Sequence, residues 1–212
     1  MAFTPQYGAY PQASAATNAA VIDAGLRAYM LRVYNWMSSG LLVTGIVAYL
    51  IANTSAINAF YPMVRTPYGV MHQPTPLAMI AMFAPLAFVL VLSLGVNRLS
   101  TTAAQGLFWA FCAAMGASLT NIFIIYTSES IVRVFFITAA TFGAMSIWGY
   151  STKADLSKMG SFLMMGLIGI IIAGLVNIFF HSSALQFAIS VIGVVVFTGL
   201  TAYDTQRIKA TY

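Results

Sequence analysis

The sequence predicts an all-α integral membrane protein with six transmembrane helices. Of its 212 residues, 60% are hydrophobic and only 6% are charged, and the mean hydropathy is +0.88. A soluble domain carries about 25% charged residues, most of them on its surface, so this chain has too few to cover itself in water. Six apolar segments are each close to the ~20 residues that a helix needs to cross a bilayer core.

The N-terminal residues 1–20 are predicted to form a disordered cytoplasmic tail. They contain Pro5, Gly8 and Pro11 among many Ala, Ser and Gln residues, and no basic region precedes an apolar core as it does in a cleaved signal. Residues 21–212 are predicted to form a single transmembrane helical domain. Its first part, residues 21–34, alternates apolar and charged residues and is interpreted as an interfacial helix that leads into the first span.

The predicted spans are residues 33–52, 76–96, 104–126, 131–150, 161–180 and 184–203. The longest connection, residues 53–75, contains three prolines (Pro62, Pro67 and Pro74), a density that argues against regular structure there.

Small residues four positions apart predict close helix packing. These pairs are Ala113 and Ala117, Ala139 and Gly143, and Gly169 and Ala173. Such pairs let helix backbones approach one another in lipid, where packing drives association. A compact bundle is the main interpretation, and a glycine-lined pore is the alternative. Cys112, the single cysteine, lies inside an apolar segment and is predicted to be a small buried residue.

The distribution of Lys and Arg predicts a cytoplasmic N-terminus. With that orientation, seven of the nine cations face the inside and only Arg65 and Arg133 face the outside. Cytoplasmic connections of membrane proteins carry an excess of Lys and Arg, which favours this orientation. Because the number of spans is even, the C-terminus is then predicted to lie in the cytoplasm as well. Because the cations are scattered at the ends of segments, they do not form a nucleic-acid-binding face.

Several polar residues lie within the spans. Asn35, Asn121 and Asn177 are candidates for lining a pore, although each can equally bond to a neighbouring helix. Glu129 and Arg133 lie four residues apart at the start of the fourth span, a spacing that predicts a local ion pair, with a substrate gate as the alternative.

The sequence shows no catalytic constellation, and the protein is expected not to be an enzyme. His72 and His181 both fall in predicted connections and have no metal-ligand spacing. The chain also lacks a GxSxG motif and a pair of aspartates inside spans. No cofactor is expected.

Asp204 is the residue that most requires an explanation. It is one of four acidic residues and follows directly on the sixth apolar segment. A carboxylate costs roughly 2.5 to 3.5 kcal/mol at the centre of a bilayer and less near its surface, so it calls for a partner or a function. Arg207, three residues later, offers an interfacial ion pair as the simpler explanation.

Four stretches of the chain resemble the Bax inhibitor family, and most closely its bacterial members. They are residues 137–146, 149–156, 159–162 and 197–209, and the resemblance extends from about Gly25 to the last residue. It implies a fold in which six helices wrap a central seventh, and a pH-sensitive calcium leak that is controlled by two aspartates near the cytoplasmic side.

The resemblance assigns one of those two aspartates to Asp204, which would be a pH sensor and a calcium ligand. The second aspartate belongs to the seventh helix of the family, and this sequence ends at Tyr212 before such a helix. Either the natural protein continues beyond that point or it is a six-span variant without the partner carboxylate. Arg98 occupies a place comparable to an arginine of the closed-state latch in bacterial relatives.

The expected function is therefore a calcium leak in the bacterial inner (plasma) membrane, with calcium as the transported ion and the lipid bilayer as the surrounding partner. The alternative is a regulatory or accessory protein that binds a membrane protease or a larger membrane complex.

Overall fold

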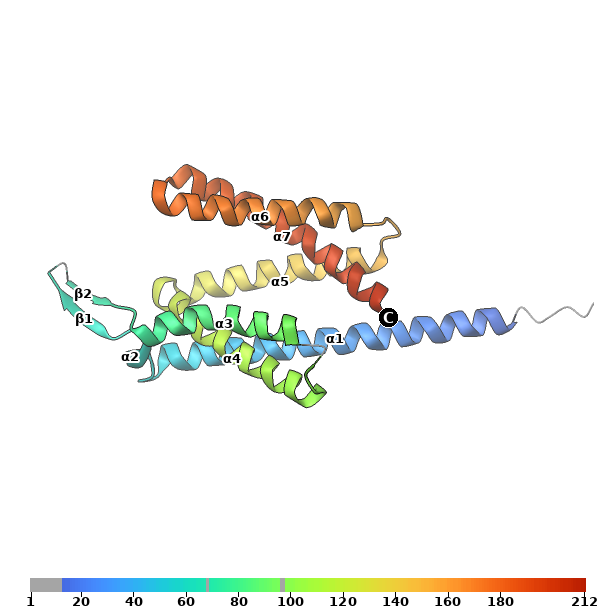
Figure 1. Cartoon of the computed structure of the whole chain (residues 1–212), viewed down its shortest axis with the longest axis horizontal. Coiled ribbons are helices and arrows are strands. Elements are labelled where there is room, and N and C mark those ends of the chain that lie inside the picture. The colour runs from blue at the N-terminus through green and yellow to red at the C-terminus, as the bar shows by residue number, and fades with distance from the viewer. Residues whose placement is uncertain (1–12, 68, 96–97) are drawn as a thin grey trace, which may run out of the picture. The chain divides into compact units, whose positions relative to one another are not determined.

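The computed structural model describes residues 13–67, 69–95 and 98–212. The elements are α1 (Ala13–Asn53), α2 (Ile57–Phe60), β1 (Met63–Thr66), β2 (Gly69–His72), α3 (Pro76–Gly95), α4 (Thr101–Ile125), α5 (Ser128–Ser151), α6 (Ser157–Phe180) and α7 (Ser183–Thr211) (Figure 1). Helix α1 begins at Ala13, before the end of the predicted tail, and residues 1–12 of that tail lie outside the described residues.

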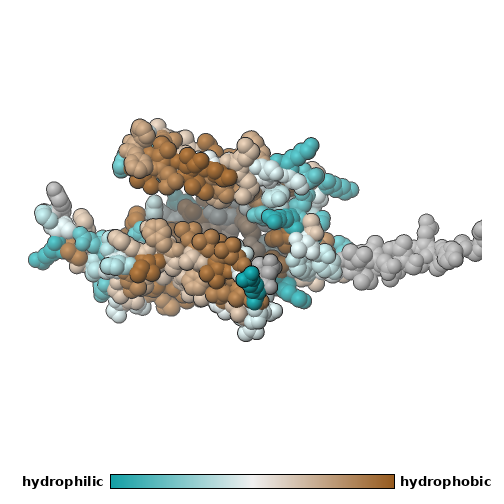
Figure 2. All heavy atoms as spheres, viewed as in Figure 1, coloured by the Kyte–Doolittle hydropathy of each residue, from teal (hydrophilic) through white to brown (hydrophobic). Residues whose placement is uncertain are grey.

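The prediction of six membrane-spanning helices is confirmed. Among the described residues, α3, α4, α5, α6, α7 and the part of α1 from Asp23 onwards are long and apolar enough to cross a bilayer. Large apolar side chains cover the visible sides of the long helices in Figure 2, and Leu94 and Phe179 are 82% and 83% exposed. An apolar surface of this extent is typical of helices that contact lipid.

The chain divides into two compact units. One contains residues up to Val33 and from Ala139 to Tyr212, and the other contains residues Tyr34–Thr138. Helices α1 and α5 each contribute to both units. The unit that ends at Tyr212 contains the Asp204 region, and we call it the C-terminal unit.

In the unit formed by residues 34–138, the connection between α1 and α3 differs from the prediction. It contains the short helix α2 and an antiparallel hairpin in which Met63 pairs with His72 and Thr66 with Gly69 (Figure 1). The prolines do not interrupt the ladder because they lie outside the strands. Gly69 has a φ of +124°, which a glycine tolerates without strain.

Helices α1 and α4 of the same unit approach closely at Gly116. A Cβ atom placed there would lie 2.6 Å from the carbonyl oxygen of Thr44 and 2.8 Å from Cβ of Val47. The Thr44 hydroxyl also donates a hydrogen bond of 3.0 Å to the carbonyl of Cys112. Cys112 is 3% exposed, so the prediction of a small buried residue is confirmed.

Gly143 and Gly169, which belong to two of the predicted small-residue pairs, are not points of close packing. Within the described residues, a Cβ atom at Gly143 or Gly169 would meet nothing within 4 Å. A four-residue spacing places two small residues on one face of a helix, but it does not determine which face another helix covers. The ion pair predicted between Glu129 and Arg133 is confirmed, with 3.2 Å between the carboxylate and guanidinium atoms.

In the C-terminal unit, α7 packs against α5, α6 and the start of the span in α1. The contact with α6 buries Leu163, Val196 and Leu200. The contact with α5 brings Gly149 against the backbone of Ala202. The ring of Tyr212 lies 5.5 Å from that of Tyr29 on α1, measured between ring centroids.

Candidate functional site at the end of α7

Asp204 lies within α7 and not after it. The helix was predicted to end near Tyr203 but continues to Thr211, because no Gly or Pro follows Gly199 and the intervening residues include good helix formers such as Gln206 and Ala210. The side chain of Asp204 is exposed. Among the described residues, Asp204 forms no ion pair with Arg207, although the two are one turn apart.

The two residues before Asp204 pack tightly against α5 and α6. Ala202 is fully buried against Gly149. A Cβ atom on Gly160, in the first turn of α6, would lie 2.5 Å from the ring of Tyr203, so only glycine leaves room for this ring. Successive residues of a helix point about 100° apart, so the Asp204 carboxylate projects from a different face of α7 than the side chain of Tyr203 does.

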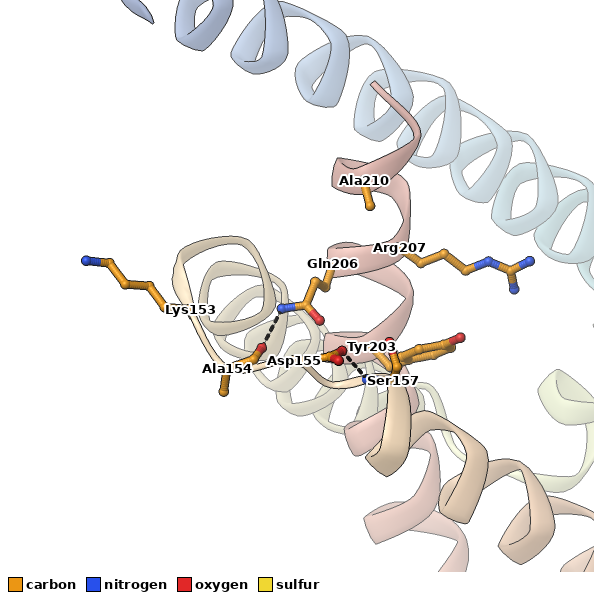
Figure 3. Close-up of a pocket in the computed structure, with 8 residues that line it drawn as sticks. All are labelled: Lys153, Ala154, Asp155, Ser157, Tyr203, Gln206, Arg207 and Ala210. Atoms are coloured by element: carbon orange, nitrogen blue, oxygen red, sulfur yellow. Dashed lines mark hydrogen bonds between the residues drawn. The ribbon is translucent and has the colours of Figure 1, made fainter.

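Gln206 attaches α7 to the connection between α5 and α6, residues 152–156. Its side-chain nitrogen donates a hydrogen bond of 2.8 Å to the carbonyl of Ala154, and its side-chain oxygen accepts one of 2.9 Å from the backbone N–H of Leu156. Figure 3 shows the amide pointing at Ala154 from the side of α7. We call these two hydrogen bonds the Gln206 clamp.

Lys209 lies about one turn beyond Gln206 and contacts the last turn of α5. Its ammonium group donates a hydrogen bond of 2.8 Å to the carbonyl of Tyr150 and lies 4.9 Å from the centroid of the Tyr150 ring. The last carbonyls of a helix have no partner within the helix and carry partial negative charge, so a cation there is favourable. Gln206 and Lys209 together connect α7 to α5 and to the start of α6.

Asp155 caps the start of α6. Its carboxylate accepts a hydrogen bond of 2.9 Å from the backbone N–H of Ser157. The pKa of Asp155 lies below its ordinary value of 3.8, chiefly because the side chain and the backbone of Ser157 hydrogen-bond to the ionised carboxylate, with a further contribution from the charge of Lys158. The exposed Asp155 therefore keeps its charge to a lower pH than an ordinary aspartate does.

A hollow of about 370 Å³ lies between these groups. It is lined by Lys153, Ala154, Asp155, Ser157, Tyr203, Gln206, Arg207 and Ala210. Asp204 is not among the lining residues. Lys153 and Arg207 extend away from Gln206 in opposite directions (Figure 3), so the two cations do not converge on one ligand.

The asparagines predicted to line a pore have different surroundings. Asn35 and Asn121 are exposed. The side-chain oxygen of Asn177 accepts a hydrogen bond of 3.0 Å from the backbone N–H of Ser182, across the turn where His181 adopts a left-handed conformation with a φ of 49°. Asn177 thus stabilises the turn between α6 and α7.

Arg98 belongs to the unit of residues 34–138 and follows α3, where its backbone N–H donates to the carbonyl of Gly95 at 2.8 Å. Its side chain is exposed. Among the described residues, no group of three or more His, Cys, Asp or Glu side chains is arranged to hold a metal ion.

Neither the hydrogen bonds of Gln206 and Lys209 nor the buried hydroxyl of Ser146 was predicted from the sequence. Gln206 and Lys209 lie in the stretch 197–209 that carries the family resemblance. They follow Tyr203 by about one and two helical turns, so a helix predicted to continue past Tyr203 would have included both residues and placed Gln206 close to the face that carries its ring. Ser146 on α5 is 8% exposed, and its hydroxyl oxygen is buried without a hydrogen-bond partner among the described residues.

Comparison with known proteins identifies relatives along most of the chain. The family described as "Inhibitor of apoptosis-promoting Bax1" matches residues 26–212. An uncharacterized protein of Rickettsia prowazekii is 50% identical over 190 residues, which are 90% of this chain and 76% of the relative. The inner membrane protein YbhL of Escherichia coli K12 is 45% identical over 186 residues, 88% of this chain and 75% of YbhL. An uncharacterized membrane protein of Streptococcus pyogenes is 33% identical over 193 residues, 90% of this chain and 79% of the relative.

Proposed function

Since the chain belongs to the Bax inhibitor family, we propose that this multi-pass membrane protein is a pH-sensitive calcium leak of the bacterial inner membrane, with Asp204 as part of its sensor. It carries out no covalent chemistry in this role. The observation that carries the proposal is the state of Asp204: an exposed carboxylate without an ion pair among the described residues, within a helix of membrane-spanning length.

The physical basis is the response of a carboxylate to protons and to calcium. Two carboxylates that lie close together cannot both ionise without a cost, so they share a proton at low pH and repel each other at high pH. Calcium prefers several oxygen ligands, which carboxylates and backbone carbonyls provide. A second carboxylate that approaches Asp204 would therefore make helix packing depend on pH.

The cations of the C-terminal unit support an orientation with this end in the cytoplasm. Arg207 and Lys209 lie on the last turns of α7, which contact the end of α5 and the region around Gly25 and Tyr29 on α1. Lys153 and Lys158 lie beside the start of α6, and Arg27 lies between Gly25 and Tyr29 on α1. An excess of Lys and Arg at one end of a membrane protein is typical of its cytoplasmic side.

The test is calcium flux through the full-length protein in liposomes. It is measured between about pH 5 and pH 8, roughly the range in which pH-dependent switches of proteins change their charge. Asp204→Asn removes the charge and is expected to alter the flux and to flatten its pH dependence, whereas Asp204→Glu is expected to retain both. Asp23→Asn, which removes another exposed carboxylate of the C-terminal unit, is the matched control.

Unchanged flux and pH dependence in Asp204→Asn would refute the sensor. If the purified wild-type protein conducts no calcium and instead co-purifies with a stoichiometric membrane protein after gentle extraction, the accessory role replaces the leak.

A further inference from the structure

We propose that Gln206 is a positioning residue that links the charge of Asp204 to the connection between α5 and α6. This inference rests on the proposed function, because it assigns a mechanical output to the same sensor. Its basis is the Gln206 clamp, which joins α7 to residues that lie 50 and 52 positions away in the sequence.

The clamp satisfies two backbone groups that have no other regular partner. Ala154 and Leu156 lie between the end of α5 at Ser151 and the start of α6 at Ser157, so neither the Ala154 carbonyl nor the Leu156 N–H belongs to a helix ladder. A glutamine amide carries a donor and an acceptor side by side, and here it uses both. Leu156 itself is 4% exposed, so the clamp fixes a buried residue at the start of α6.

Asp204 and Gln206 move together because they belong to one continuous helix, Ser183–Thr211. Tyr203 and Gln206 are one turn apart and contact Gly160 and the 152–156 connection, while Asp204 projects from a different face. A rotation or sliding of α7 that relocates the carboxylate therefore displaces the amide of Gln206 as well. This displacement acts directly on Ala154 and Leu156.

The clamp responds to such a movement in a stepwise manner. Its hydrogen bonds are 2.8 Å and 2.9 Å long, and a hydrogen bond is effectively lost beyond about 3.5 Å. A shift of α7 by about 1 Å away from the connection would lengthen both hydrogen bonds beyond this limit, since they are made by one amide group. Two separated groups are coupled when both influence an element that has two discrete arrangements, and the intact and broken clamp are two such arrangements.

Several charged and titratable groups lie around the Gln206 clamp. Lys153 and Asp155 lie on the connection and Lys158 on the first turn of α6. Tyr203, Arg207 and Lys209 lie on α7, and Tyr150 lies at the end of α5. No histidine is among these residues, so they include no group of the type that ordinarily titrates near neutral pH.

The test uses Gln206→Ala in the full-length protein, with Gln186→Ala as the matched control, because Gln186 is an exposed glutamine near the other end of α7. The first readout is the pH midpoint of calcium flux in liposomes. Loss of the clamp is expected to change the ratio of the two arrangements about fivefold, which for a transition linked to one proton moves the midpoint by about 0.7 pH unit. Gln186→Ala is expected to leave the midpoint in place.

The second readout does not depend on flux. Hydrogen exchange of the Leu156 amide is expected to accelerate severalfold in Gln206→Ala and to stay slow in Gln186→Ala. In the wild-type protein this exchange is expected to change with pH beyond the intrinsic chemical rate, and that excess is expected to disappear in Asp204→Asn. Gln206→Glu keeps the acceptor for Leu156 but loses the donor for Ala154 when ionised, so its effect is expected to be intermediate.

The outcomes separate this inference from the proposed function. If Asp204→Asn alters flux but Gln206→Ala moves neither the midpoint nor the Leu156 exchange, the link is refuted and the sensor stands. If Asp204→Asn leaves flux unchanged, the sensor is refuted, and hydrogen exchange of the Leu156 amide then tests the link by itself. The link is refuted if this exchange depends on pH equally in the wild type and in Asp204→Asn, and it is supported if the pH dependence is lost in Asp204→Asn.

Discussion

Gly149 on α5 lies directly against the backbone carbonyl of Ala202 on α7, so that the two helices touch backbone to backbone two residues before Asp204. Ala202 is completely buried by this contact. Any side chain at position 149 would meet backbone atoms, which cannot rotate away as a side chain can.

Replacing Gly149 by Ala is expected to destabilise the protein by about 1 to 3 kcal/mol, the usual cost of inserting atoms into a well-packed core. Thermal unfolding in detergent measures the effect. Gly143→Ala on the same helix is the control, because a Cβ atom there meets nothing within 4 Å among the described residues. That substitution is expected to be neutral or stabilising, since Ala favours helix more than Gly does. Equal effects of the two substitutions would show that the backbone contact at Gly149 is absent.

A second prediction concerns Gly116, where α4 meets α1. Gly116→Ala would place a methyl group against the Thr44 carbonyl and the side chain of Val47, and we expect a loss of about 1 to 3 kcal/mol. Gly106, also on α4, has open space around its Cβ position and provides the control. The prediction is wrong if Gly116→Ala unfolds at the same temperature as Gly106→Ala.

The hydroxyl of Ser146 yields a third prediction. It is buried without a hydrogen-bond partner among the described residues, and an unpaired buried polar group costs about 1 to 3 kcal/mol. Ser146→Ala removes that cost while leaving only a small space, so we expect unchanged or increased stability in the same unfolding measurement. A clear destabilisation would mean that the hydroxyl binds a partner, such as an internal water.

The hydroxyl of Thr44, unlike that of Ser146, is buried with a hydrogen-bond partner. Its hydroxyl is 3.0 Å from the Cys112 carbonyl in a buried contact between α1 and α4. Thr44→Val keeps the shape but removes the hydrogen bond, and hydrogen bonds between membrane helices contribute about 0.6 kcal/mol on average. A loss of roughly that size is expected, with Thr44→Ser retaining the bond. If Thr44→Val is as stable as the wild type, the hydrogen bond makes no net contribution.

The carboxylate of Asp155 predicts a defined pH dependence. Its pKa is lowered in the folded protein, so its contribution to stability is present at neutral pH and is lost as the pH falls through and below its ordinary value of 3.8. Asp155→Ala is expected to unfold at a lower temperature than the wild type at pH 7, and the difference is expected to shrink toward pH 3. A difference that stays constant over this range would exclude the ionised carboxylate as the cause.

Much of the fold follows from the sequence because hydrophobicity along the chain is a local property. The six spans and the ion pair of Glu129 with Arg133 each depend on residues within one segment. The hairpin after α1 was not predicted, since its prolines lie at strand ends and in the turn, where they do not oppose pairing. The extension of α7 past Asp204 was also missed because the apolar pattern ends before the helix does.

The sequence by itself determined that this chain contains six apolar segments long enough to span a membrane and belongs to the Bax inhibitor family, and that a carboxylate stands at the end of the sixth segment. Only the tertiary structure decided that Gly149 and Gly160, and not Gly143 or Gly169, contact the neighbouring helix. It also decided that Gln206 joins α7 to Ala154 and Leu156. The physical reason is that these contacts join residues about 40 to 50 positions apart, and the face that each helix presents to the next depends on packing between helices, which spacing within one helix does not encode.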